Sequence, residues 1–304
     1  MPLTPEQQAE IDSQRANPHH TLRAVAPGME QHLYVAHPVL DHGFIRVVDY
    51  MGDDAAICQA ARVSYGRGTK SVQNDEGLIR YLMRHWHSSP FEMCEVKLHV
   101  KLPVFVARQW IRHRTANVNE YSGRYSILDR EFYIPAPDHL AAQSSVNNQG
   151  RGEVLQGDEA QRVLNLLRDD AMRSYDNYEA MLSQDGQQGL ARELARMNLP
   201  TNIYTQWYWK VDLHNLLHFL RLRADSHAQY EIRAYADVLC DIVADWVPAA
   251  FGAFRDYRMN AVSLSAQAVD VLRRRLAGEV VTQENSGMAA REWREFQAVW
   301  EKGA

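Results

Sequence analysis

The sequence predicts a fold that combines β-strands with packed helices and contains no dinucleotide-binding Rossmann domain. Over residues 96–102, apolar side chains alternate with Lys97, His99 and Lys101, a period of two that is typical of a half-buried strand. From Asp75 onward, apolar residues instead recur at helical spacing. No Gly-x-Gly-x-x-Gly motif follows a strand, so we expect no Rossmann cradle for a dinucleotide.

The residues before Asp75 are expected to supply a second strand and a capped helix. Residues 43–50 have the composition of a strand. Asp53 or Asp54 can cap a helix over residues 55–62. Residues 66–70 are rich in glycine but lack the spacing of a phosphate-binding loop, and we interpret them as a flexible turn.

The clearest strand leads into the most polar stretch of the chain. Strand 96–102 ends at Pro103, and a helix is then expected to run to Arg112. The polar stretch, residues 109–126, therefore begins at the end of a helix. Regular elements around it can hold its side chains in place.

The second half of the chain is predicted to be mainly helical. Residues 141–152 are rich in Gln, Ser, Asn and Gly and are interpreted as a mobile surface loop. The apolar content of residues 203–222 favours one long helix. Other helices are expected from Thr4, over residues 159–183, 188–197, 230–246 and 249–257, and as two polar amphipathic helices within residues 263–304.

Composition narrows the class of protein. The 304 residues carry 33 Lys and Arg against 38 Asp and Glu, a formal charge of −5, which disfavours general nucleic-acid binding. Cys58, Cys94 and Cys240 have neither disulfide nor metal spacing, and we expect them to be packed in apolar surroundings. There is no apolar signal core and no window near the roughly 20 apolar residues of a membrane span. We expect a soluble, cytoplasmic protein.

Residues 109–126 gather the groups that bind an anionic heterocyclic ligand. Arginine holds phosphate oxygens in a bidentate fork, and Arg112, Arg114 and Arg124 lie within this stretch. Gln, Glu and Ser side chains can hydrogen bond to ring positions, while Gly123 permits close approach or a positive φ. A charged run is more often a solvated face, but here the arginines alternate with hydrogen-bonding groups. The pattern therefore favours a small anionic ligand.

Two other interpretations of these residues stay open at this point. The stretch could serve a non-catalytic module that binds RNA or nucleotides. His85, His87 and His113 could serve a metal-dependent hydrolase, although His85 and His87 face apart on a helix, which disfavours a shared metal.

The sequence resembles the flavin-dependent thymidylate synthase family. Arg112-His113-Arg114, seven residues and Ser122 match the family's Arg-His-Arg-x7-Ser signature, and the match continues through Gly123-Arg124-Tyr125. Two more blocks match in the family's order, at residues 82–92 and 222–229. The similarity covers roughly residues 43–258.

The resemblance implies an α+β fold with a mixed sheet and packed helices, and an enzyme that methylates dUMP reductively to dTMP. It implies 5,10-methylenetetrahydrofolate as carbon donor, releasing tetrahydrofolate, and NADPH as reductant through FAD. It also implies a homotetramer with FAD at subunit interfaces, small-molecule substrates, and neither nucleic acid, membrane nor metal as a partner. We divide the chain into an N-terminal extension (1–42), a catalytic domain (43–262) and peripheral C-terminal helices (263–304), all within one domain overall.

The family's binding residues carry over to matching positions. Arg223 is implied to be catalytic, because a guanidinium at N3 and the adjacent carbonyl of uracil would activate the ring without a thiolate. Asn117 stands where the family often has Ser. Binding of dUMP is implied for Gln109, Arg112, Glu120, Tyr121, Ser122, Gly123, Arg124, Arg196 and Arg223, and binding of FAD for Ser89, Arg112, His113, Arg114, Thr115, Glu120, Asp212, His214 and His218.

Overall fold

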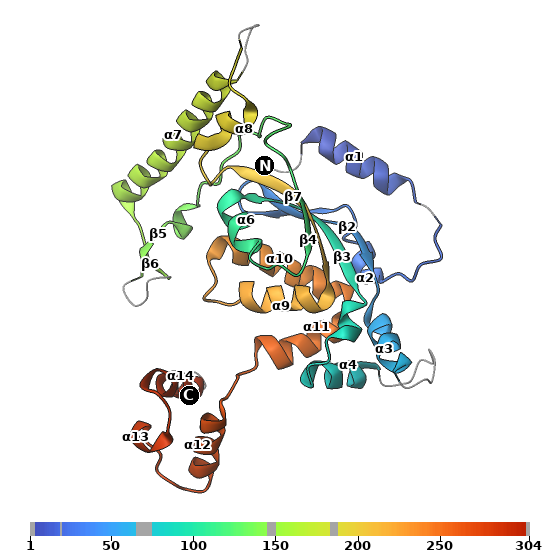
Figure 1. Cartoon of the computed structure of the whole chain (residues 1–304), viewed down its shortest axis with the longest axis vertical. Coiled ribbons are helices and arrows are strands. Elements are labelled where there is room, and N and C mark those ends of the chain that lie inside the picture. The colour runs from blue at the N-terminus through green and yellow to red at the C-terminus, as the bar shows by residue number, and fades with distance from the viewer. Residues whose placement is uncertain (1–3, 19, 65–74, 145–149, 183–187, 302–304) are drawn as a thin grey trace. The chain divides into compact units, whose positions relative to one another are not determined.

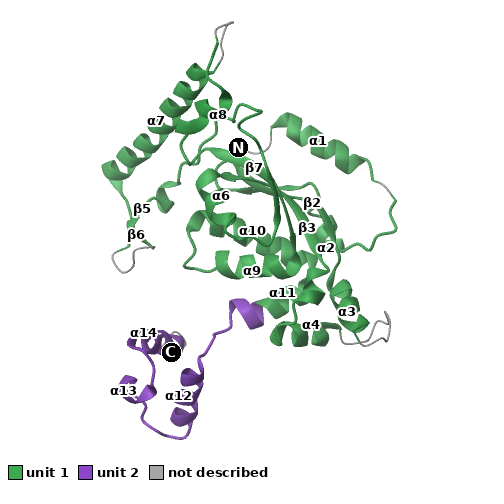
Figure 2. Ribbon diagram, in the orientation of Figure 1, with its two compact units in different colours: residues 1–254 green, residues 255–304 purple. Residues whose placement is uncertain are grey.

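The computed structural model describes residues 4–18, 20–64, 75–144, 150–182 and 188–301. The chain forms two compact units, residues 1–254 and residues 255–304 (Figure 2). The domain limits expected from the sequence, at residues 42 and 262, remain predictions.

The first unit is built on a five-stranded sheet with the order β1-β2-β3-β7-β4 (Figure 1). Each of its four strand pairings is antiparallel, and one isolated parallel bridge joins Leu33 to Val47. Together with the packed helices, the sheet confirms the α+β class. The strands are β1 (Ala36–Val39), β2 (Gly43–Met51), β3 (Glu95–Pro103), β4 (Asn117–Glu120) and β7 (Tyr204–Asp212), and a separate hairpin pairs β5 (Ala141–Gln143) with β6 (Arg151–Val154).

The helices of this unit include the 25-residue α7, which lies apart from the sheet in Figure 1. No helix among the described residues is long and apolar enough to cross a membrane. The helices are α1 (Pro5–Ala16), α2 (Pro27–Glu30), α3 (Asp54–Val63), α4 (Asp75–Arg84), α5 (Ser89–Glu92), α6 (Val104–Trp110), α7 (Gly157–Met181), α8 (Arg192–Ala195), α9 (Leu213–Arg223), α10 (Tyr230–Trp246) and α11 (Pro248–Phe254), with 3-10 turns η1 (Pro137–His139) and η2 (Arg196–Asn198).

One face of the sheet is apolar and carries the core. Helices α6, α9 and α10 pack against this face. Trp110, at the end of α6, is fully buried, and its ring lies edge-on to Trp207 and Trp209 of β7 at centroid distances of 5.9 and 5.2 Å. The same ring contacts Phe219 of α9 at 4.6 Å and Tyr235 of α10 at 5.9 Å. Four elements therefore meet at one side chain.

The predicted helix over residues 203–222 is wrong in its first half. Residues 204–212 form β7, which pairs with β3 on one side and β4 on the other, and the helix α9 starts only at Leu213. Trp207, Trp209 and Val211 repeat at a period of two and are all buried, which is the pattern of a strand. Asp212 ends the strand and caps α9, its side chain accepting from Asn215 N at 2.9 Å.

Other local predictions have mixed outcomes. Strands 43–50 and 96–102 are confirmed as β2 and β3, and Asp53 caps α3 by accepting from Ala56 N. The expected helix over residues 188–197 is only the short α8 and η2, because a single turn closes there before Leu199. The predicted loop at 141–152 is wrong at both ends, because residues 141–143 form β5 and residues 151 and 152 begin β6, and the two strands pair. The turn predicted at residues 66–70 lies outside the described residues.

The second unit has a small core of its own. Its described helices are the π-helical turn η3 (Arg255–Met259), α12 (Ala266–Leu276), α13 (Gln283–Ser286) and α14 (Ala290–Glu301). Residues 263–304 thus contain the short α13 between the two longer helices, where the sequence predicted two helices. Val271, Met288, Trp293 and Phe296 pack together, and the Arg275 guanidinium lies 5.2 Å from the Trp293 ring centroid.

The other face of the first unit's sheet is polar and half-buried around His99. His99 Nδ1 lies 3.0 Å from the Arg46 guanidinium, and its Nε2 lies 2.9 Å from Gln206 Oε1. Because Arg46 can only donate, Nδ1 accepts and Nε2 carries the proton. The ring also stacks on Tyr208 at 5.1 Å. These contacts suit a neutral imidazole, and burial followed by Arg46 lowers the pKa of His99 to about 4.

We expect the free energy of unfolding to fall as the pH drops from about 6.5, the ordinary histidine pKa, to about 4. In this window the unfolded chain binds a proton at His99 that the folded chain does not bind. The contribution of His99 to the free energy of unfolding is thus fully present above pH 6.5. Acidification to pH 4 lowers the free energy of unfolding by on the order of 3 kcal/mol. Urea unfolding at pH 4.5 and 7.5 measures it. His99→Gln should flatten the pH dependence and His85→Gln, at an exposed ring, should keep it. Equal slopes in all three proteins would contradict the assignment.

Candidate functional site

The end of α6 carries the first group of predicted site residues. Gln109 lies in the last turn of α6, and its Oε1 is buried without a hydrogen-bond partner among the described residues. Arg112 and Arg114 follow the helix, are exposed and form no ion pair within the described chain. Trp110, between them and the sheet, holds this turn in place.

His113 lies in a cluster with residues of β7 and α9. Its ring centroid is 5.5 Å from that of His218, 5.6 Å from Phe219 and 6.4 Å from Trp209. His113 Nε2 lies 3.1 Å from Thr115 Oγ1, and the ring also bonds to the backbone of Asn215. The structure therefore brings His113 and Thr115 from one block of the sequence to the first two turns of α9.

The histidines of this cluster are held neutral. Burial, with His218 next in order, lowers the pKa of His113. Burial, with His214 and then Arg221, lowers the pKa of His218. Asp212 is committed to capping α9, its Oδ1 and Oδ2 both bonded to Asn215. At neutral pH the imidazoles can therefore donate or accept hydrogen bonds without adding charge.

Arg223 ends α9 with a half-buried side chain that has no hydrogen-bond or ion-pair partner among the described residues. Its Nε is buried and unbonded, and it forms no ion pair with any described residue. The two carboxylates that could have neutralised it are engaged elsewhere, Asp225 with His227 and Glu231 with Arg151. Burial lowers the pKa of Arg223, although a guanidinium stays protonated at any ordinary pH. An uncompensated buried cation is costly unless a ligand offsets it.

A second group lies at the other end of β7, in the loop that follows β4. Glu120 Oε1 accepts from Thr205 Oγ1 at 2.9 Å, and Tyr121 N donates to Gln206 O at 2.8 Å. Ser122 O accepts from the amides of Tyr125 and Ser126, so residues 122–126 form a tight turn. We call residues 121–128 the nucleotide loop.

The short segment α8–η2 packs against the nucleotide loop. Arg124 Nε donates to Glu193 Oε2 at 3.1 Å, and Arg196 has no ion pair within the described residues. A Cβ on Gly123 would lie 3.4 Å from the Arg196 side chain. Gly123 has no positive φ, and a Cβ there would make ordinary van der Waals contacts with Arg196 and Leu128.

The two groups attach to β7 at different points. His113 contacts Trp209, whereas the nucleotide loop is anchored at Thr205 and Gln206. At about 3.3 Å per residue, Trp209 is about 10 Å from Gln206 and about 13 Å from Thr205 along the strand. The residues expected to bind dUMP thus divide between them: Gln109, Arg112 and Arg223 in the first group, and Glu120, Tyr121, Ser122, Gly123, Arg124 and Arg196 in the second.

The remaining candidates are placed as follows. Ser89 opens α5, which packs on α9, so it lies on the side of the His113 cluster. Among the described residues, no three His, Cys, Asp or Glu side chains are grouped to hold a metal, and His85 and His87 instead stack near Tyr81. Asn117 is exposed at the start of β4, opposite Lys210.

Sequence reasoning missed three residues that shape the site. Glu193 pairs with Arg124, and Asn215 bonds to His113. Both had an available signal, because Glu193 lies in the Ala-Arg-Glu-Leu-Ala-Arg block with Arg196, and Asn215 lies between Asp212 and His218. Thr205, which bonds to Glu120, had none.

Comparison with known proteins identifies the family. A family model described as thymidylate synthase complementing protein matches residues 46–249. The flavin-dependent thymidylate synthase of Ruegeria pomeroyi is 80% identical over 299 residues, covering 98% of this chain and 99% of the relative. That of Gluconobacter oxydans is 66% identical over 299 residues, covering 98% of each chain.

A solved structure resembles the first unit's fold. It is the UMP/dUMP methylase PolB from Streptomyces cacaoi, crystallised with 5-Br dUMP, with a TM-score of 0.66 and 31% sequence identity. The match covers 72% of this chain and 97% of that chain. With the family model spanning most of the chain and relatives aligned almost end to end, the chain belongs to the family of flavin-dependent thymidylate synthases.

Proposed function

We propose that this protein methylates dUMP at C5 of the uracil ring to give dTMP. The carbon comes from 5,10-methylenetetrahydrofolate, which leaves as tetrahydrofolate, and NADPH supplies the hydride equivalent and becomes NADP⁺. When bound, FAD would carry the reducing equivalents from NADPH to the one-carbon unit. The observation that carries this proposal is the partly buried, unpaired guanidinium of Arg223 beside a neutral histidine cluster.

The unpaired arginines fit the charges of the proposed ligands. Arg112, Arg114, Arg196 and Arg223 form no ion pair among the described residues. In a protein with a net charge of −5, four such cations at positions predicted to bind ligands suit the monophosphate of dUMP and the pyrophosphate of FAD. The buried, unbonded Oε1 of Gln109 adds an acceptor for an N–H group of a ligand.

Arg223 would act as a fixed cation at the uracil ring. A guanidinium that donates to a ring carbonyl and lies at a deprotonated N3 stabilises the anionic form of the ring, which makes C5 more nucleophilic. The half-buried setting strengthens this interaction because water screens it less. The role needs no proton transfer to arginine, which is consistent with its chemistry.

Two of the three cysteines, Cys58 and Cys94, are unsuited to attack the pyrimidine ring. Burial raises the pKa of the Cys58 thiol to about 11 and that of Cys94 to about 12, so both stay protonated and weakly nucleophilic at neutral pH. Their Sγ atoms donate to backbone carbonyls of Asp75 and Asp53. Activation by charge therefore fits this chain better than activation by a thiolate.

The separation of the two binding groups supports a site shared between copies of the chain. His113, which follows Arg112, contacts Trp209 of β7, whereas the loop that carries Arg124 is anchored at Thr205 and Gln206. These points are about 10 to 13 Å apart along the strand. We propose a homotetramer in which FAD and dUMP bind between subunits, one giving the His113 cluster and another the nucleotide loop.

We expect the purified protein to be yellow, with the absorbance bands of oxidised flavin, and to release tritium from [5-³H]dUMP. Release should require FAD, NADPH and 5,10-methylenetetrahydrofolate, because C5 loses its hydrogen when the carbon is attached. Scintillation counting of the water fraction, with each component omitted in turn, measures this. Flavin-loaded protein that releases no tritium with all components present would disprove the proposed activity.

Arg223→Ala should retain FAD and lower kcat/KM by 100-fold or more, the scale expected for loss of an electrostatic group at the reacting ring. Arg221→Ala is the matched control, because Arg221 has the same side chain on the same last turn of α9 and is exposed. It should stay within a few-fold of wild type. Equal losses in the two variants would indicate a general effect of charge, and wild-type turnover in Arg223→Ala would refute the proposed role.

A further inference from the structure

The nucleotide loop is held in shape by side chains that bind its carbonyl groups. Tyr121 Oη donates to Ile127 O at 3.0 Å, within the loop itself. From outside the loop, an Arg192 guanidinium nitrogen donates to Tyr125 O at 2.6 Å, and Tyr175 Oη donates to Leu128 O at 2.5 Å. Arg192 belongs to α8, next to Arg196, whereas Tyr175 belongs to α7, a helix that none of the matched motifs includes.

The bond from Tyr175 acts on the part of the loop that is expected to bind the ligand. Leu128 Cδ1 lies 3.5 Å from the position of a Cβ on Gly123, and the same position lies 3.4 Å from Arg196. Leu128 thus fills the space under Gly123, on the opposite end of the loop from Tyr121. If Leu128 moved, the packing between Gly123 and Arg196 would loosen.

One turn of α7 is built around this bond. Tyr175 is 3% exposed, and the Arg130 guanidinium lies 5.3 Å from its ring centroid. Arg130 also pairs with Asp176 and, at 3.2 Å, with Glu179. This turn of α7 therefore contacts the segment after the nucleotide loop twice. The Tyr175 hydroxyl bonds to Leu128, and the carboxylates of Asp176 and Glu179 pair with Arg130. Burial, and then Glu179, raise the pKa of Tyr175 to about 12, so the hydroxyl keeps its proton.

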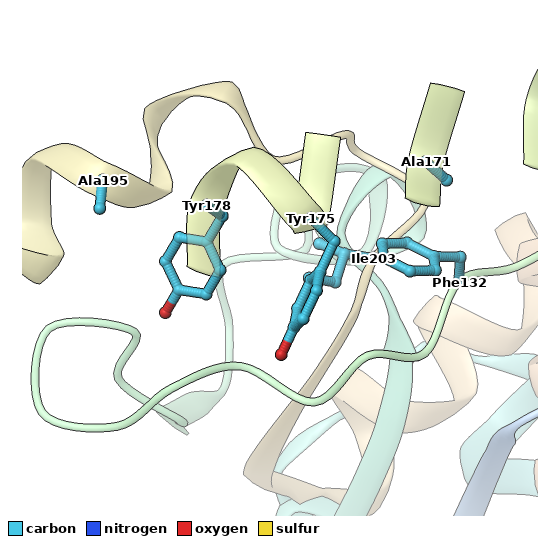
Figure 3. Packing of buried hydrophobic residues seen from close by; sticks show 6 residues of the cluster. All are labelled: Phe132, Ala171, Tyr175, Tyr178, Ala195 and Ile203. Carbon is cyan, nitrogen blue, oxygen red and sulfur yellow. The ribbon is translucent and has the colours of Figure 1, made fainter. Parts of the chain in front are cut away.

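Tyr178 provides a natural comparison on the same helix. It is 1% exposed and packs in the same cluster as Tyr175, Phe132 and Ile203, with ring centroids of the two tyrosines 5.5 Å apart. Figure 3 shows both rings leaving α7 side by side, with their hydroxyls directed toward the segment that leads into Phe132. Yet the Tyr178 hydroxyl has no hydrogen-bond partner among the described residues.

We propose that Tyr175 is a positioning residue for nucleotide binding: its hydroxyl, bonded to Leu128 O, holds the nucleotide loop in the shape that presents Ser122, Gly123 and Arg124 beside Arg196. The inference rests on the proposed function, since dUMP is the ligand whose phosphate the arginines would bind. Tyr178 shares the packing of Tyr175 but not the bond to the loop. The two tyrosines therefore separate positioning of the loop from stability of the core.

The test compares Tyr175→Phe with Tyr178→Phe in the full-length, FAD-loaded protein. Tyr175→Phe should raise the KM for dUMP about 5-fold, the effect of losing one hydrogen bond, with kcat and FAD binding near wild type. Amide hydrogen exchange at Tyr125 and Ser126, whose N–H groups bond to Ser122 O, should become faster. Tyr178→Phe should leave both measurements unchanged and keep or raise Tm, because it removes an unbonded buried hydroxyl.

Two results would overturn the inference: wild-type KM and exchange in Tyr175→Phe, or the same changes in Tyr178→Phe. If Tyr175→Phe does not fold, Arg130→Gln replaces it, since Arg130 holds the same turn of α7 from the surface and its loss should also raise the KM for dUMP. If the wild-type protein does not bind dUMP, the proposed function fails. The exchange rates of the two tyrosine variants then still decide whether Tyr175 orders the loop.

Discussion

The packing around Trp110 is the constraint on which the His113 cluster depends. Its indole is completely buried among Trp207, Trp209, Phe219 and Tyr235, which come from β7, α9 and α10. Arg112 and His113 follow directly in the chain, so the angle at which α6 leaves the sheet is set by an aromatic side chain that has little freedom to move. Edge-to-face contacts favour particular ring orientations. Because they fix the orientation of Trp110, they also fix where the polar residues that follow it begin.

The polar groups at that border include buried atoms without hydrogen-bond partners among the described residues. Arg223 Nε and Gln109 Oε1 are buried without partners, which costs free energy in the isolated chain. The buried carboxylate of Glu231 is treated differently: it accepts from Arg151, Tyr133 and Gln229, and although burial raises its pKa, the bonds from Arg151 and Gln229 bring the pKa below the ordinary value. The fold can thus compensate a buried charge fully. Where it leaves one uncompensated, the missing partner is best supplied by a ligand.

The nucleotide loop depends on a different kind of support. It lies beyond the end of β4 and is held by hydrogen bonds from Tyr175 and Arg192 to its carbonyl groups. These contacts are local and each is worth little, so the loop can adjust more readily than the His113 cluster. In the proposed function, the more rigid cluster would bind the flavin and the reacting ring, and the loop would bind the phosphate.

The sequence by itself determined the family, most of the regular elements and the identity of the charged residues, because motif spacing, alternation over residues 96–102 and the capping role of Asp53 are local properties of the chain. It could not place residues 204–212 in a strand. Their apolar side chains suit a buried helix equally well, and the decision came from pairing with β3 and β4, which are distant in sequence. Only the tertiary structure left Arg223 unpaired while engaging Asp225 and Glu231, separated the two binding groups along β7, and brought Tyr175 to Leu128. Those relations depend on which side chains meet across the fold, and no spacing along the chain encodes that.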